Sequence, residues 1–172
     1  MIERPQPGEY APYTVKYFDR VPDGDILAHL ADGPVRVTAA FDRVPEGQFG
    51  TPMAPGEWAP AAVLQHIIDD ERIYCYRVLR AARGDTTELP GFDQEAFAAN
   101  ANASRRARAE MLDEFAAVRG ATVHLLRSLA PETLGLIGIA EGKPMSPRAA
   151  AWHIAGHEAE HRATVEEHDV WV

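Results

Sequence analysis

Residues 146–162 read SPRAAAWHIAGHEAEHR, and this stretch predicts a helix that carries chemistry. Ser146 is a preferred N-cap residue and Pro147 suits the first helical position, so a helix is predicted from here to about Glu167. It spaces three histidines four residues apart: His153, His157 and His161. Residues four apart are about 6 Å apart along the axis and share one face, so two imidazoles at this spacing can hold one metal ion.

The three histidines cannot all bind the same ion. His153 and His161 are about 12 Å apart along the axis, whereas the ligand nitrogens of one zinc ion lie about 3.4 Å apart. Either His153/His157 or His157/His161 is the ligand pair, and helix geometry does not choose between them. A third ligand must come from elsewhere. The candidate is His66, in LQHIIDDER, beside apolar positions of another predicted helix; an ordinary half-buried core histidine is the other interpretation.

Three further segments space their apolar residues at helical intervals. Residues 22–44 do so with an interruption at Pro34, where a kink or break is expected. Residues 60–83 form the best-defined helix of the first half. A long helix is predicted over 104–129, with Ser104 as its N-cap.

Four helices of about 20 residues joined by loops indicate an all-α protein, a four-helix bundle of up-and-down or crossover type. A short helix is expected within 93–102, and a small hairpin turning at Glu141-Gly142 within 131–145. Residues 1–21 are predicted to form an extended arm over a single domain that spans 1–172.

The composition is that of an ordinary globular protein, with 172 residues, 46% hydrophobic and 25% charged. A formal net charge of −9 argues against binding to nucleic acid or anionic membrane, which requires clustered Lys and Arg. No apolar run approaches the roughly 20 residues that span a bilayer, and the N-terminus lacks the apolar region of a signal peptide. We therefore expect a cytoplasmic protein with no nucleic-acid and no membrane partner.

The single cysteine, Cys75, excludes an intramolecular disulfide and is expected to be a buried, unreactive filler. It lies nine residues beyond His66, about 13.5 Å along the same helix, so it cannot complete a metal site there. Glu71 is turned about 140° away from His66 and is also poorly placed. Water or substrate is therefore the expected fourth ligand of a three-histidine site.

These segments together resemble the DinB/YfiT-like superfamily, in its DinB-like branch. The resemblance is carried by GEWAPAAVLQHIIDDERIYCYRVLRAARGD at 56–85, LPGFDQEAF at 89–97 and SPRAAAWHIAGHEAEHR at 146–162. With the helix at 104–129, they span most of residues 20–168. The order is typical of the family: a tryptophan eight residues before a histidine, an Arg-x-x-Arg-Gly-Asp helix exit, and G-H-x-x-x-H on the final helix.

The resemblance implies a four-helix bundle, often a homodimer, with a three-histidine metal site. Carried over residue by residue, the metal ligands are His66, His157 and His161, and zinc or nickel is the expected metal. Family members of known activity use or transfer low-molecular-weight thiols. The implied function is a metal-dependent enzyme of thiol S-transferase or hydrolase type that acts on a small-molecule substrate. His153 inherits no ligand role, and hydrogen bonding to a ligand, lining of the pocket and core packing all stay open for it.

Two alternatives remain beside this enzyme. A non-catalytic bundle that binds a metal or a small molecule is the main one. A zinc protease is the minor one, because residues 157–161 match H-E-x-x-H, but Glu167 stands where a third histidine ligand would be and no strand-rich lobe precedes.

Several charged residues near the histidines are candidates for supporting roles. Glu158 or Glu160 could act as a base, or simply belong to a solvated face. One carboxylate following His66 could accept the N–H of a ligand histidine, and the candidates are Asp69, Asp70 and Glu71. A substrate carboxylate could bind to basic residues that would otherwise form a solvated face, namely Arg77, Arg80 and Arg83.

Overall fold

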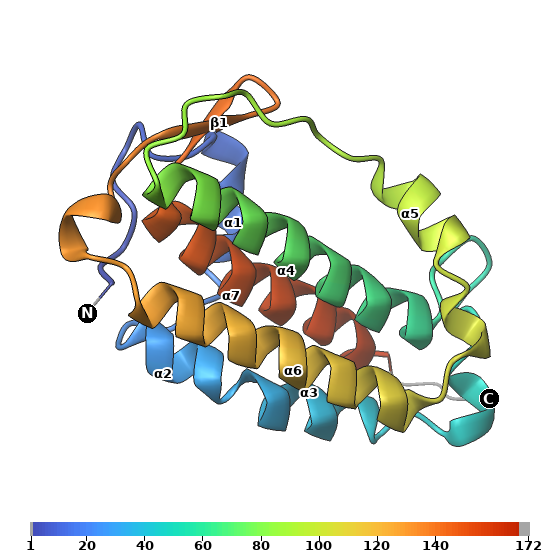
Figure 1. Ribbon diagram of the computed structural model, residues 1–172. Helices are drawn as coiled ribbons and strands as arrows, with labels where there is room; N and C mark the ends of the chain where they lie inside the picture. The colour runs from blue at the N-terminus through green and yellow to red at the C-terminus, as the bar shows by residue number, and fades with distance from the viewer. Residues whose placement is uncertain (1, 169–172) are drawn as a thin grey trace.

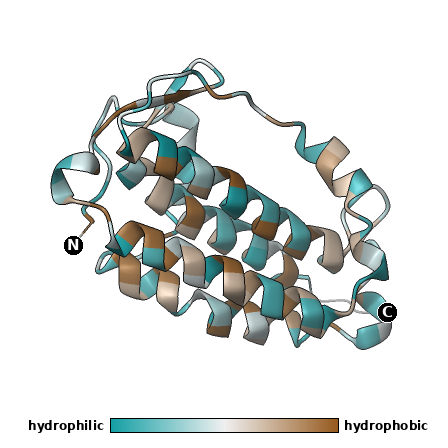
Figure 2. Ribbon diagram, viewed as in Figure 1, coloured by the Kyte–Doolittle hydropathy of each residue, from teal (hydrophilic) through white to brown (hydrophobic). Residues whose placement is uncertain are grey.

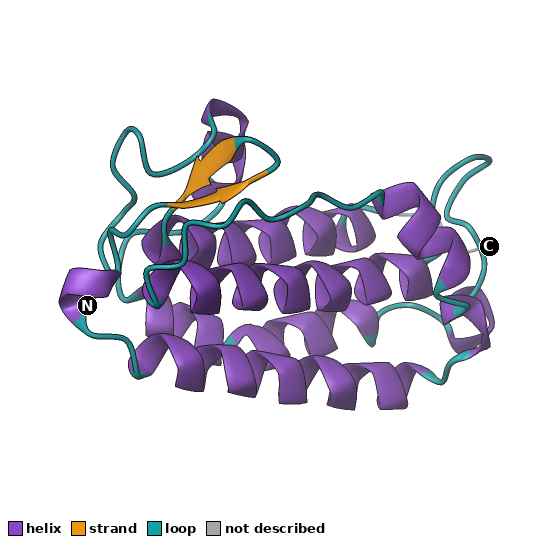
Figure 3. Ribbon diagram, turned by 45° about the horizontal axis from the view of Figure 1, so that its top comes forward, coloured by secondary structure: helices purple, strands orange, loops and turns teal. Residues whose placement is uncertain are grey.

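The computed structural model describes residues 2–168 and confirms an all-α four-helix bundle (Figures 1 and 3). The bundle consists of α2 (Ile26–Ala31) with α3 (Gly33–Phe41), α4 (Pro60–Ala82), α6 (Arg108–Arg127) and α7 (Pro147–Glu166). α4 packs against α6 and α7, and the α2–α3 pair packs against the same two helices. No helix within residues 2–168 is long and apolar enough to cross a membrane.

Local sequence explains where these helices begin and break. Ser146 caps α7 as predicted, because its Oγ accepts a hydrogen bond from the backbone N–H of Ala149 at 3.0 Å. The break predicted near Pro34 separates α2 from α3. Gly33 opens α3 because a β-carbon there would collide with the guanidinium of Arg119, which lies in the bundle interior.

Short elements close the ends of the bundle. The predicted short helix is α5 (Gln94–Asn100), and the predicted hairpin is β1 (Gly138–Ala140) paired antiparallel with β2 (Lys143–Met145). Its turn uses left-handed backbone at Glu141 (φ 53°) and Gly142 (φ 69°), as expected for a two-residue hairpin loop. Single 3₁₀ turns lie at Pro12–Thr14, Glu46–Gln48, Ala103–Arg105 and Pro131–Thr133.

The predicted start of the third bundle helix at Ser104 is wrong. α6 begins at Arg108, after Ala107 as its N-cap, and Ser104 lies in a 3₁₀ turn. The backbone is left-handed at Asn102 and extended at Arg106, so a helical path cannot be established earlier. Arg106 uses this extended turn to donate a hydrogen bond to Gln65 on α4.

The N-terminal arm is only partly extended. After a segment without helix, it forms α1 (Val15–Phe18), which packs against α7. Glu9 anchors the arm, since its carboxylate accepts hydrogen bonds from Ser146 and Arg148 at the start of α7. α1 approaches α7 so closely that the Tyr17 carbonyl lies where a β-carbon of Gly156 would be. The sequence pattern did not show this helix because prolines and tyrosines obscure its period.

The buried apolar residues form two clusters rather than one. One cluster includes Leu30, Val78, Leu126 and Trp152. The other includes Phe41, Leu64, Met111 and Phe115. Hydrophobic and hydrophilic positions are mixed along every bundle helix (Figure 2). Buried polar residues occupy the middle of the helices between the two clusters, and they include Asp70, Glu71, Arg119, Thr122, His157 and Glu158. The chemistry of this polar layer defines the candidate site.

The close approach of α1 to α7 predicts opposite effects for two helical glycines. Gly156→Ala should lower the free energy of unfolding by roughly 1–3 kcal/mol, because the added methyl group collides with backbone atoms of Tyr17. Gly120→Ala on α6 should raise it by about 0.5–1 kcal/mol, because that site is exposed and open and alanine favours helix. Urea unfolding followed by circular dichroism measures both. Equal effects of the two substitutions would show that α1 does not pack as described.

Candidate metal centre

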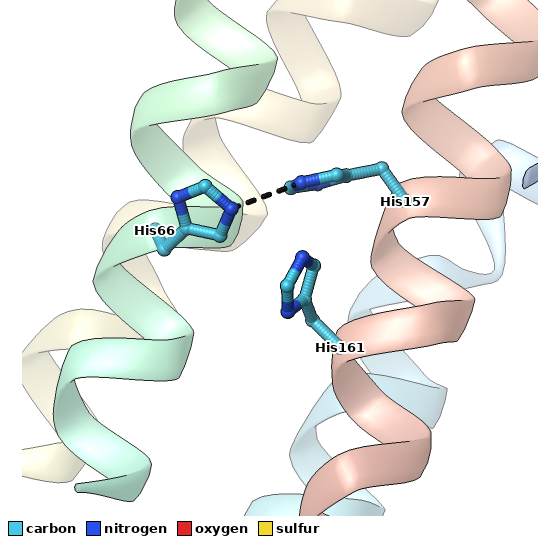
Figure 4. A group of neighbouring side chains, drawn as sticks. All are labelled: His66, His157 and His161. Atoms are coloured by element: carbon cyan, nitrogen blue, oxygen red, sulfur yellow. Dashed lines mark hydrogen bonds between the residues drawn. The ribbon is translucent and has the colours of Figure 1, made fainter. Parts of the chain in front are cut away.

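Three histidines from two helices converge in the polar layer (Figure 4). His66 comes from α4, and His157 and His161 come from successive turns of α7. One ring nitrogen of each lies within 4.8 Å of the others, and Nε2 of His66 is 3.0 Å from Nε2 of His157. His66 and His157 are buried, whereas His161 is half-buried at the edge of the group. The structure thus brings together all three residues that the resemblance singled out.

Contacts between polar side chains of α4 and α7 continue along both helices beyond His66 and His157. Asp70, one turn beyond His66 on α4, faces His157 and His153, so later positions on α4 meet earlier positions on α7. Its Oδ2 lies 3.4 Å from Nδ1 of His157 and 3.2 Å from Nε2 of His153. Among the three carboxylates considered from the sequence, Asp70 is therefore the one that faces a candidate ligand, while its hydrogen bond is to Nε2 of His153. The negative charge beside Nδ1 of His157 favours the tautomer with its proton on Nδ1, and that tautomer has a lone pair on Nε2.

Electrostatics keep these groups in the protonation states that a metal site needs. Burial lowers the pKa of His66 and of His157, and lowers the pKa of His161 to about 4. All three rings are thus neutral near pH 7. Burial alone would raise the pKa of Asp70, but the facing His157 and His153 hold it well below the ordinary carboxyl value. An ionised carboxylate beside neutral imidazoles is the arrangement typical of a metal ligand and its hydrogen-bond acceptor.

His153 packs in the core and lines a pocket, which are two of the three roles that the sequence left open. It shares the Asp70 carboxylate with His157, and its ring stacks on Tyr74 with centroids 3.7 Å apart and planes 9° apart. Its Nδ1 is buried without a hydrogen-bond partner within the described structure. His153 also lines a pocket, which makes it part of the wall beside the candidate metal ligands.

Aromatic rings enclose the histidines on both sides. Trp58 lies edge-on to His66 with ring centroids 5.0 Å apart. Tyr17 of α1 lies edge-on to His157 and His153, at 5.5 and 4.8 Å. Burial raises the pKa of the Tyr17 phenol, so it remains protonated as a hydrogen-bond donor. Sequence reasoning missed Tyr17, because it placed the N-terminal segment over the domain without relating it to the histidines.

A pocket of about 210 Å³ opens on the Asp70 side of the cluster. Asp70, His153 and His157 form one wall. The remaining lining residues are polar or aromatic: Tyr13, Tyr17, Tyr74, Arg77, Phe92, Gln94 and Glu141. A small molecule in this pocket would lie against His157 while His66 and His161 stay on the far side of that ring.

Glu158 is neither a base nor part of a solvated face. Its side chain is 1% exposed and accepts a hydrogen bond from Nη1 of Arg119 at 2.6 Å. Arg119 also binds both oxygens of Glu71, at 2.9 Å and 3.1 Å from its Nε and at 2.9 Å from its Nη2. Glu160 faces outward and pairs with Arg20 at 2.7 Å. The protease interpretation of H-E-x-x-H is therefore wrong, because its glutamate is occupied by a structural ion pair in an all-helical fold.

The arginines of α4 also differ from a simple solvated face. Arg77 is buried at 6% exposure, donates a hydrogen bond to the Pro90 carbonyl at 3.2 Å, and lies over the Tyr74 ring. Arg80 pairs with Asp85, and Arg83 is exposed. Of the three, Arg77 alone reaches the pocket beside the histidines.

The fold and this cluster define a class of protein: a helical bundle in which histidines from two antiparallel helices meet beside a buried carboxylate. A family model of the DinB superfamily matches residues 29–165, and the chain belongs to this superfamily. Among solved structures it is similar to YfiT from Bacillus subtilis, with a TM-score of 0.73 and 18% identity, over 96% of this chain and 91% of that chain. YfiT is described as a probable metal-dependent hydrolase with an unusual four-helix bundle topology. At this identity the likeness shows the fold. A comparison with curated proteins gave no match.

Cys75 has the environment of an inert thiol. Burial raises its pKa to about 11, and its Sγ lies 3.0 Å from the hydroxyl of Thr122. At pH 8 the thiolate fraction should be about a hundredfold lower than for the unperturbed group. Alkylation by iodoacetamide, followed by mass spectrometry, should therefore be at least that much slower in the native protein than in urea. Cys75 is half-buried rather than fully buried as predicted, and equally fast labelling in both states would contradict the hydrogen-bonded thiol.

Proposed function

We propose that the protein is a metal-dependent hydrolase whose divalent metal ion, zinc or nickel, binds to His66, His157 and His161. The observation that carries the proposal is the 3.0 Å separation of the two Nε2 atoms while Nδ1 of His157 faces Asp70. Nitrogens bound to one ion at about 2.1 Å lie about 3–3.4 Å apart. The residues thus fit the metal that the superfamily implies, and the description of YfiT supports the choice of reaction.

The alternative ligand pair, His153 with His157, is less favourable. Asp70, His153 and His157 also offer metal-ligand atoms that lie within 4.8 Å of one another. An ion there would use Nδ1 of His157, the nitrogen that faces the Asp70 carboxylate. An ion among His66, His157 and His161 would use Nε2 of His157 and leave Nδ1 facing Asp70. The later pair of α7 is therefore the proposed one.

The residues of the chain prepare the site for one bound small molecule. Asp70 lies beside Nδ1 of His157 and favours a proton there, which leaves the Nε2 lone pair on the side of His66. Trp58 and Tyr17 restrict access of bulk water on two sides. The half-buried His161 leaves the cluster open at one edge. A divalent cation with an open position supplies positive charge that lowers the pKa of a bound water or thiol and polarises a carbonyl group.

Removal of each proposed ligand should abolish metal binding selectively. His66→Ala and His161→Ala should each reduce metal content from about one ion per chain to near zero, because two ligands rarely retain zinc. His153→Ala should retain the ion, and Asp70→Asn should weaken its affinity by about 10–100-fold, because Asp70 acts through His157. Zinc titration and elemental analysis measure both effects.

His124→Ala, an exposed histidine on α6, is the matched control and should bind metal normally. If His153→Ala loses the ion while His161→Ala keeps it, the ligand pair lies one turn earlier on α7. If no variant and no wild-type protein takes up zinc or nickel, the metal proposal is wrong.

A low-molecular-weight thiol would occupy the position that water takes in hydrolysis, and the same site would then serve as an S-transferase. Cobalt-loaded protein separates these reactions, because its absorption reports the ligands of the ion. In a hydrolase, 4-nitrophenyl acetate should be cleaved faster by the metal-loaded protein than by His161→Ala, and millimolar thiol should slow the reaction. Formation of a thiol adduct as the main product would instead identify the transferase. An unchanged cobalt spectrum with thiol and no metal-dependent cleavage would contradict both.

A further inference from the structure

A strap of residues 83–93, continued by α5, runs back along the outer face of α4 (Figures 1 and 3). It is tied down at both ends. Near the hairpin, Leu89 donates to the carbonyl of Ile139 at 2.9 Å and accepts from the N–H of Glu141 at 3.0 Å. At the other end, Trp58 Nε1 donates to Glu95 of α5 at 3.2 Å. The strap is thus a fixed wall and not an unattached loop.

Under this strap lies a second pocket, of about 360 Å³, which we call the strap pocket. Its walls are mainly apolar and include Ile73, Tyr76, Leu89, Phe92 and Phe97. Phe92 and Phe97 contact each other with ring centroids 5.1 Å apart, although Phe97 is 44% exposed. A pocket of this size and composition is typical of sites that hold the apolar part of a small molecule.

The strap pocket adjoins the polar pocket beside the candidate metal centre. Arg77 and Phe92 line both of them, so the two pockets meet at these two side chains. The bond to Pro90 uses one of the five guanidinium N–H donors of Arg77. Arg77 is therefore placed to bind an acceptor oxygen where the two pockets meet.

Glu141 adds a hydrogen-bond acceptor to the polar pocket, in which Arg77 is a donor. Its backbone is held in a left-handed conformation at the hairpin turn, a strained geometry for glutamate. Its carboxylate lies over Gly91, where any β-carbon would collide with it, and it lines the polar pocket together with Arg77. A donor from Arg77 and an acceptor from Glu141 match a carboxamide, which has both an acceptor oxygen and an N–H donor. Oε2 of Glu141 accepts a hydrogen bond from Lys143 at 3.4 Å, so Oε1, which lies over Gly91, is the acceptor for an amide N–H. A free carboxylate would add a further negative charge beside Glu141 and Asp70.

The geometry points to a medium-chain alkyl or aryl carboxamide as the ligand, with its amide group between Arg77 and Glu141 and its apolar group in the strap pocket. This inference goes beyond the proposed function, because the polar pocket lies across the His157 ring from His66 and His161, and the amide is a ligand of that pocket. Binding of the amide to these two pockets requires no metal. The experiment can therefore separate the two claims.

Calorimetric titration with butanamide, hexanamide and octanamide tests the inference on the full chain, once with chelator and once with zinc. The dissociation constant should fall by up to about fifteenfold for every two methylene groups that the strap pocket buries. The same trend should appear with and without zinc. Hexanoate should bind more weakly than hexanamide, and Arg77→Gln should weaken every amide by a similar factor.

Two substitutions should flatten the dependence on chain length, namely Phe97→Ala, which removes one wall, and Ile73→Gln, which makes the floor polar. Ile73→Gln also serves if Phe97→Ala fails to fold. Leu136→Ala, an equally exposed apolar residue away from the pocket, should leave the dependence unchanged. Absence of any chain-length dependence overturns the inference, even if zinc binds. A dimer that Phe97→Ala converts to monomer in sedimentation, with no binding of octanamide by the wild-type protein, would also overturn it and assign this face to a second copy of the chain.

Discussion

The guanidinium of Arg119 touches all four helices of the bundle. It extends from α6, binds Glu71 on α4 and Glu158 on α7, and donates to the Leu30 carbonyl of α2 at 3.1 Å. All three charged side chains are at most 2% exposed, so each depends on the others for solvation. Removing one partner from such a network typically costs about 3–5 kcal/mol, because the remaining charge is buried without compensation. Arg36 and Arg162, 3.6 Å and 3.8 Å from Glu158, bring two further positive charges to this group.

This network fixes the register of α4 against α7, and the register in turn assembles the candidate site. Glu71 and Glu158 each directly follow a residue of the site, Asp70 and His157 respectively. Neighbouring residues on a helix point about 100° apart, so one of each pair can face Arg119 while the other faces the opposite helix. A slip of one turn would separate the glutamates from Arg119 and the imidazole from Asp70 at once. The buried ion pairs of Arg119 and the candidate metal ligands therefore lie in one polar layer, which divides the apolar core in two.

What the sequence could predict depended on local signals. The Ser146 cap, the break before α3 and the hairpin turn were predicted, because Ser, Pro and Gly act on their own backbone. His66 was already the candidate third ligand from its place on another predicted helix, the family resemblance chose His157 and His161 as its partners, and the structure places the three rings together. The role of Glu158 was not predictable, because an amphipathic pattern does not reveal that a charged residue has a buried partner 39 positions away. The same limit explains the error at Ser104, a good capping residue that tertiary contacts of Arg106 displaced from the helix start.

His157 connects the two halves of the site through a single ring. Its Nε2 faces His66, and its Nδ1 faces Asp70, whose carboxylate also faces His153 and the polar pocket. The Asp70 carboxylate thus lies between His153, to which it is hydrogen-bonded, and Nδ1 of His157. The polar pocket and His66 therefore lie toward different nitrogens of one imidazole, on helices whose register Arg119 holds.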